Sequence, residues 1–197
     1  MADSLYLSLW FPSFDEPEIL PRAVSVLRQF SFSARRPGVT YVAVHPVSWN
    51  EPTILEQRFQ LGITPEQAAG VAVELLHEDY AYVFEAYWDL WSPAARGGDW
   101  VETPTLVRFI AQGAQFEEGA AAETGHIQVD FGLDAPFLYE ELALTSEAED
   151  RVKGNVQKLV QFTALLEKNA DATGRLLWSE SEENLAQKLI ARLQRVN

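Results

Sequence analysis

The sequence predicts an α+β fold with an antiparallel-rich sheet, or sheets, and helices on one face. Segments with an apolar residue at every second position, typical of half-buried strands, are interspersed with segments whose apolar residues recur every three or four positions, typical of amphipathic helices. The expected order is strand, helix, two strands, helix, strand, and then two strands, helix, strand, helix. Helices that cover one face of such a sheet define the α+β class.

Four elements are expected before residue 64. Residues 5–11 place Leu5, Leu7, Leu9 and Phe11 on one face, which predicts a strand. Asp15 and Glu18 form a capping pair, so a helix should follow and become regular near Leu20. After the Pro37-Gly38 turn, residues 39–47 predict a strand, and residues 54–61 predict a further short strand.

Thr64-Pro65-Glu66-Gln67 gives the clearest helix start of the chain. It combines an N-cap hydroxyl, proline at the first helical position and glutamine at the third. A long aromatic strand is expected next, over residues 80–91. The segment 93–104 contains Pro93, Gly97, Gly98 and Pro104, and therefore predicts a loop or linker.

The rest of the chain predicts strands over 106–116 and 126–133, with the acidic, alanine-rich segment 117–125 as a hairpin loop. Ser146 with Glu149 should open a long helix. A short strand over 175–178 and a last helix, capped by Ser179 and Glu182, complete the expected elements.

The element order of the first half resembles the split βαβ pattern of ferredoxin-like folds, and the second half could supply a similar unit with one strand missing or exchanged. The predicted units are therefore residues 1–92 and 105–197, joined by 93–104 and sharing one compact body. This resemblance concerns element order alone and implies no function, because such folds carry many unrelated activities.

Composition excludes several classes of function. The chain has 197 residues, no Cys and a formal net charge of −14. The acidity argues against nucleic-acid partners and anionic membrane surfaces, which require clustered Lys and Arg. The lack of Cys excludes disulfides, a thiolate nucleophile and Cys-ligated metal. Since no targeting segment or membrane-spanning stretch is visible, we expect a soluble cytoplasmic protein.

Known catalytic and nucleotide-binding motifs are absent. The sequence has no Gly-x-Ser-x-Gly, no P-loop, no Gly-x-Gly-x-x-Gly and no His-Glu-x-x-His, and its histidines, His45, His77 and His126, are scattered. We therefore expect no cofactor and no metal site. Whether the protein is an enzyme stays open, although missing motifs weigh against catalysis.

Carboxylates inside predicted strands are the main chemical candidates. Alternation over 80–91 places Glu85, Tyr87 and Asp89 on the face opposite Phe84 and Trp88. Paired carboxylates can do acid/base work or bind a hard cation, whereas the simpler alternative is a half-exposed sheet face. The catalytic candidates are Glu85, Asp89, His126 and Asp130. The ligand-binding candidates are Tyr6, Ser8, Trp10, Tyr87, Gln128 and Arg108.

Arg108 is ambiguous in this set, because alternation groups it with Leu106 and Ile110. Trp88, Trp91 and Trp100 flank the segment 93–104 and are candidates for partner binding, since exposed Trp is enriched in binding hot spots. The alternative is that these aromatic side chains are buried in the core.

These observations favour a non-catalytic protein-binding module that recognises a basic protein through electrostatic steering. One alternative is a small-molecule-binding protein or enzyme that uses the polar and aromatic sheet face. The other is a structural or oligomerising domain. We expect the chain to be either a monomer or a homodimer formed by pairing of sheet edges.

Overall fold

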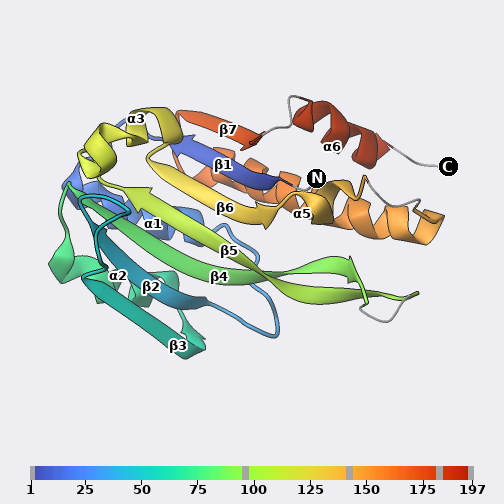
Figure 1. The fold of residues 1–197 in the computed structure, drawn as a ribbon, viewed down its shortest axis with the longest axis horizontal. Coiled ribbons are helices and arrows are strands. Elements are labelled where there is room, and N and C mark those ends of the chain that lie inside the picture. The colour runs from blue at the N-terminus through green and yellow to red at the C-terminus, as the bar shows by residue number, and fades with distance from the viewer. Residues whose placement is uncertain (1–2, 95–97, 141–143, 181–183, 195–197) are drawn as a thin grey trace.

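The computed structural model describes residues 3–94, 98–140, 144–180 and 184–194 and confirms the α+β class. Seven strands form one antiparallel sheet in the order β3-β2-β4-β5-β6-β1-β7 (Figure 1). The strands are β1 (Ser4–Trp10), β2 (Val39–Pro46), β3 (Leu55–Ile63), β4 (Tyr80–Pro93), β5 (Trp100–Gln112), β6 (Ile127–Leu133) and β7 (Gly174–Ser179). The helices are α1 (Ile19–Leu27), α2 (Pro65–Ala72), α3 (Ala121–Thr124), α4 (Ala135–Leu138), α5 (Ser146–Asn169) and α6 (Leu185–Gln194), with short 3-10 turns at Glu16–Glu18, Val73–Leu75 and Phe116–Gly119.

The core lies between one face of the sheet and the helices α1, α2 and α5. Alternation in β1 buries Leu5, Leu7 and Leu9 there, and the apolar stripes of the helices pack against the same cluster. We call the opposite face of the sheet the open face. No helix of the described chain has the length and apolar character needed to cross a membrane.

Two of the expected helix starts are observed and one shifts by a residue. Thr64 caps α2 by accepting a hydrogen bond from the Gln67 N–H. Asp15 and Glu18 form a capping box at the 3-10 turn before α1. In α5 the N-cap is Thr145 rather than Ser146, because the Thr145 hydroxyl accepts from the Ala148 N–H. Residue 182 lies outside the described part of the chain.

The two predicted halves, 1–92 and 105–197, share this single sheet, and ferredoxin-like halves are not confirmed. β1 pairs with β6 and β7, both from the second half. The strands β2, β3 and β4 lie together, separated from β1 by β5 and β6. The strand order of the sheet therefore mixes the two halves, which element order along the chain cannot reveal.

The segment 93–104 is mainly a hairpin rather than a linker. β4 extends to Pro93, β5 begins at Trp100, and residues 100–104 pair with residues 89–93; residues 95–97 lie outside the described chain. Figure 1 shows this hairpin arm extending beyond the neighbouring strands. β5 ends at Gln112, short of the predicted 116, and the predicted loop 117–125 contains the helix α3.

β2 does not extend alongside the part of β4 within the arm, because β2 begins opposite Ala86. Three groups replace the missing strand. The Ser33 N–H donates to the Tyr87 carbonyl (2.6 Å), and Lys158 Nζ donates to the Asp89 carbonyl. The buried Asn155 side chain both accepts from the Trp91 N–H (2.8 Å) and donates to the Trp91 carbonyl (2.9 Å). The backbone at this edge is therefore hydrogen-bonded without a strand beside it.

Candidate functional site

One row of residues crosses the open face through all seven strands. The pairing registers place its members opposite one another from edge to edge. In order they are Arg58, Tyr41, Glu85, Arg108, Asp130, Tyr6 and Trp178. We call this the cross-sheet row. It brings together four sequence-predicted candidates, Glu85, Arg108, Asp130 and Tyr6, and resolves the ambiguity of Arg108 in favour of the open face.

Glu85 is clamped between two arginines in this row. Only 6% of the residue is exposed. Its Oε1 accepts from Arg108 Nε at 2.9 Å, and its Oε2 lies 3.7 Å from a terminal nitrogen of Arg58. The hydrogen bond to Glu85 raises the pKa of the Arg108 guanidinium further above its already high value. Both carboxylate oxygens are thus engaged, which offsets the cost of burying the charge.

Tyr41 lies beneath Arg58 in the same row. The Arg58 guanidinium sits 4.4 Å from the centre of the Tyr41 ring, a cation–π contact. Burial is the main cause that raises the pKa of the Tyr41 hydroxyl, and the carboxylate of Glu56 adds to it. This end of the row is therefore a packed cluster, and its side chains stabilise one another.

Asp89 and Tyr87 do not join Glu85 in a common site. Asp89 Oδ1 accepts from the Ser33 hydroxyl at 2.7 Å, and Oδ2 accepts from the Ala34 N–H at 3.1 Å. The Tyr87 ring lies 3.8 Å from the Arg36 guanidinium. Asp89 thus anchors the segment before β2 against the hairpin arm. Among the described residues, no group of three or more His, Asp or Glu could hold a metal ion.

His126 lies towards the end of the sheet where β6 begins. Its Nδ1 accepts from the Phe11 N–H at 3.0 Å, and its ring stacks on Phe14 at a centroid distance of 4.8 Å. Burial lowers the pKa of this imidazole below its ordinary value. The catalytic candidates Asp89, His126 and Asp130 each hold separate backbone partners, since Asp130 Oδ1 accepts from the Gly132 N–H at 2.8 Å.

The remaining ligand-binding candidates lie beside the cross-sheet row. Ser8 is buried, and its hydroxyl accepts from Trp178 Nε1 at 3.1 Å. Gln128, half-buried, is the register partner of Ser8. Trp10 Nε1 donates to the Ala122 carbonyl at 3.1 Å. Tyr6 packs against Trp178 at a centroid distance of 4.7 Å, so these two rings face each other.

The three tryptophans near the arm have different environments. Trp88 is fully buried and stacks on Phe131, so it belongs to the core and presents no surface to a partner. Trp91 is half-buried beneath Arg151, whose guanidinium lies 3.9 Å from its ring. Trp100 is half-buried and meets Tyr139 edge-on at 5.1 Å.

Negative charge is concentrated at the end of the sheet that lies far from the arm. The sequence pattern of the single segments did not predict this feature. Five segments meet at this end, at the left of Figure 1: 11–18, 47–54, 73–79, 113–126 and 170–173. They contain no Lys or Arg. They contain eleven carboxylates, namely Asp15, Glu16, Glu18, Glu51, Glu74, Glu78, Asp79, Glu117, Glu118, Glu123 and Asp171. We call this the acidic end.

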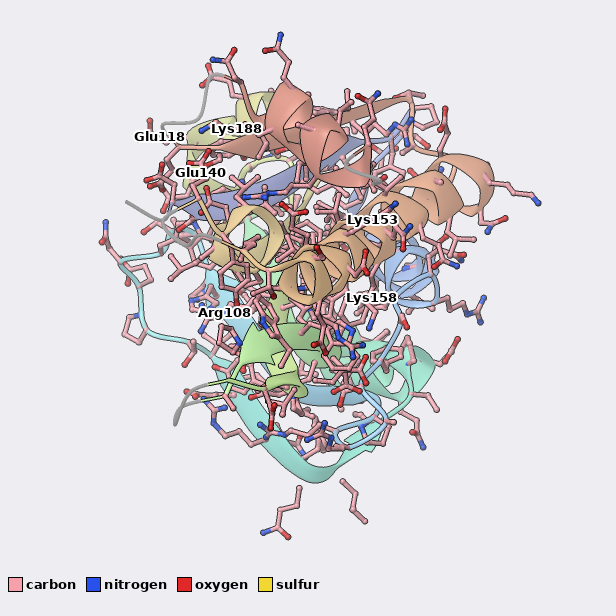
Figure 2. The ribbon with its side chains drawn as sticks, turned by 90° about the vertical axis from the view of Figure 1, so that its right-hand side faces the viewer. Arg108, Glu118, Glu140, Lys153, Lys158 and Lys188 are labelled. Atoms are coloured by element: carbon pink, nitrogen blue, oxygen red, sulfur yellow. The ribbon has the colours of Figure 1, made fainter. Side chains whose placement is uncertain are left out.

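Few basic groups reach the acidic end. Arg22 of α1 approaches Glu18 and Asp171, at 3.5 and 3.7 Å. Figure 2 looks at the molecule from the opposite end, where Lys153, Lys158 and Lys188 come from α5 and α6. Lysine and arginine are therefore absent from the five segments of the acidic end, whereas the other end carries both basic and acidic side chains, such as Lys188 and Glu140. The sequence contains a signal for this difference, but only as a sum over segments that the topology brings together.

Trp49 stands within the acidic end with 43% of its surface exposed. Its ring meets Phe116 and His45 edge-on, each at a centroid distance of 4.9 Å, and its backbone N–H donates to Glu117 Oε1 at 2.7 Å. The side chain is therefore exposed on one side and held on the other.

Two hollows between described residues are small. One of about 160 Å³ is lined by Leu138, Glu140, Lys188, Ala191 and Arg192. Another of about 110 Å³ lies beside Leu9, Leu166 and Gly174. Small-molecule sites usually occupy about 300–1,000 Å³, and neither hollow is lined by a sequence-predicted site residue.

Comparison of the chain with protein-family models, with curated proteins and with solved structures found no match.

Proposed function

We propose that this protein is a non-catalytic cytoplasmic binding module whose acidic end recognises a basic protein. The observation that carries the proposal is the presence of eleven carboxylates, without Lys or Arg, in five segments along one end of the sheet. A surface of one sign raises the local concentration of an oppositely charged partner and speeds its association.

Trp49 offers an apolar contact for the partner, which the carboxylates cannot provide. Tryptophan is enriched among the residues that dominate binding energy, particularly where neighbouring groups exclude water. Contacts with Phe116 and His45 hold the ring in place, so that binding costs little side-chain entropy. Carboxylates at the same end of the sheet as a fixed, exposed aromatic ring suit a basic protein surface that also has an apolar patch.

The backbone at the acidic end supports a fixed shape. Val47, Glu117 and Glu118 all have positive φ angles, of 60°, 50° and 56°. The Glu117 N–H donates to the Val47 carbonyl at 2.9 Å, which ties two of these residues together. Strained backbone of this kind persists where surrounding contacts enforce it and clusters at functional sites.

Charge neutralisation tests the proposal. Affinity capture from an extract, followed by titration of a captured basic protein, compares wild type with Glu51→Gln/Glu74→Gln/Glu118→Gln and with Trp49→Ala. We expect the triple variant to bind about tenfold more weakly at low salt, and the wild-type affinity to fall as salt screens the charges. Trp49→Ala should weaken binding at every salt concentration.

A matched control changes the same number of charges elsewhere. Glu147→Gln/Asp150→Asn/Glu180→Gln neutralises exposed carboxylates outside the acidic end and should keep wild-type affinity. The proposal fails if both triple variants lose affinity equally, since binding would then follow net charge alone. It also fails if no basic protein is captured at low salt.

A further inference from the structure

We propose that two copies of this chain associate through β3, edge to edge, to form an antiparallel homodimer with a continuous sheet. The inference is independent of the proposed function, because it uses a different surface. β3 is the last strand of the sheet and pairs with β2 on one side. A second copy on its other side would give a sheet of fourteen strands, twice the seven of one chain.

The first part of the β3 edge, Leu55–Arg58, carries no proline, lysine or bulge that would block such pairing. Exposed edges are commonly blunted by proline, lysine or a covering segment. The nine residues Leu55–Ile63 contain neither proline nor lysine. Apolar side chains are exposed on and beside the strand, with Leu61 86% and Ile54 46% accessible.

The sequence of β3 is complementary to itself in one register. Glu56 and Arg58 are two residues apart, so they share a face of the sheet. A two-fold axis through Gln57 would place Glu56 opposite Arg58 of the second copy, and Arg58 opposite its Glu56. The same register would place Leu55 opposite Phe59 twice. Opposite charges and paired apolar side chains across strands both stabilise a sheet.

Neighbouring registers are disfavoured. An axis through Arg58 would place the Arg58 side chains of the two copies opposite each other, and an axis through Glu56 would do the same for the two Glu56 carboxylates. Like charges directly opposite each other destabilise strand pairing. An axis that passes between two residues would pair Gln57 with Arg58 of the second copy. Side chains at these two positions point to opposite faces of the sheet, so this register is excluded. The register centred on Gln57 is therefore selected by charge.

The Arg58 side chain is available for this contact. It lies over Tyr41 and near Glu85, but 70% of the side chain is exposed. At the opposite edge of the sheet, β7 carries Arg175, with no acidic residue in Gly174–Ser179 to face it. Charge complementarity therefore points to β3 rather than β7.

The straight part of the edge is short. Residues Leu55–Arg58 pair regularly with β2, and a bulge follows before Ile63. A bulge turns the strand away from a flat partner. The dimer interface would therefore centre on Glu56, Gln57 and Arg58, and association should be weak and concentration-dependent.

Sedimentation of the full chain from about 5 to 500 μM tests the association. The expected mass rises from 22.1 kDa towards twice that value. Glu56→Arg and Arg58→Glu should each remain monomeric, because each creates like-charge pairs in the dimer. Mixing the two variants should restore association, since every pair then joins opposite charges. Arg175→Glu, on β7, should behave like wild type.

A disulfide trap provides a second measurement that does not depend on these charges. The chain has no Cys, so Gln57→Cys introduces a single thiol that would face its own copy across the two-fold axis. Mild oxidation should give a covalent dimer with Gln57→Cys but not with Gln60→Cys, whose copies would lie too far apart. A wild-type mass of 22.1 kDa throughout, or equal cross-linking of both cysteine variants, would overturn the proposal.

Discussion

The two ends of the sheet use their polar groups differently. At the arm, backbone groups of Tyr87, Asp89 and Trp91 that have no neighbouring strand are hydrogen-bonded by Ser33, Lys158 and Asn155. At the acidic end, by contrast, most carboxylates lie on loops and short helical turns and face solvent, and Trp49 is exposed. Polar groups at the arm therefore stabilise the fold, whereas most carboxylates at the acidic end add charge that the fold does not require. Substitutions at the arm should lower stability, and substitutions at the acidic end should spare it.

Asn155→Leu should have the largest effect on stability. The buried Asn155 side chain bonds the Trp91 N–H, the Trp91 carbonyl and the Pro136 carbonyl. Leucine would leave these groups unpaired, and the free energy of unfolding should fall by about 2–4 kcal/mol. Urea denaturation measures the loss. Asn169→Leu, at an exposed amide that donates to Gln29, is the control and should cost less than about 0.5 kcal/mol. Equal losses in the two variants would contradict the stabilising role of the Asn155 hydrogen bonds at the arm.

Glu85→Gln should have the next largest effect. The amide would leave Arg108 and Arg58 without the buried carboxylate that both approach. Because both guanidinium groups are partly exposed, we expect a loss of about 1–2 kcal/mol rather than the larger cost of a fully buried pair. Glu118→Gln, at the acidic end, makes the same chemical change on an exposed side chain and should leave the free energy of unfolding nearly unchanged. A comparable loss in both variants would contradict the view that Glu85 stabilises the fold and that the carboxylates of the acidic end do not.

A pH titration of stability probes His126, the last residue of the acidic-end segment 113–126. Burial lowers the pKa of His126 in the folded chain, so the unfolded chain binds the proton more readily. The contribution of the neutral imidazole is therefore present in full above the unfolded pKa of about 6.5, and it is lost as the pH falls from there through the lower pKa of the folded chain. Urea denaturation between pH 7.5 and 5 should show a smaller decrease in stability for His126→Gln than for wild type. Parallel curves would contradict this role. His45, whose pKa burial also lowers, contributes in the same direction.

The sequence predicted local features well and long-range ones poorly. Alternation correctly placed Glu85 opposite Phe84, and the Thr64 capping box was correct, because both depend on neighbouring residues. The partner of Glu85 depends on which strand lies beside β4, and that follows from the whole topology. Asn155 illustrates the same limit, because it reads as an ordinary polar residue of a helix until the edge of β4 is placed next to it.

The acidic end was missed for a related reason. Its carboxylates belong to five segments that are distant in sequence, and each segment alone resembles a helix start or a loop. Only the antiparallel topology brings them to one end of the sheet. The net negative charge of the chain was evident from composition, but the location of these carboxylates at one end of the sheet followed only from the strand order.

Val47→Asn should have the smallest effect on stability, and of opposite sign. Val47 has a φ of 60°, in the left-handed region that β-branched residues avoid, and 55% of it is exposed. Asparagine tolerates this conformation, so the free energy of unfolding should rise by up to about 1 kcal/mol. Val101→Asn, on the exposed surface of strand β5, is the control and should lower stability slightly, because asparagine is disfavoured in strands. A loss of stability in Val47→Asn would mean that packing of this side chain outweighs the backbone strain. Residues of the acidic end would then stabilise the fold in the same way as those of the arm.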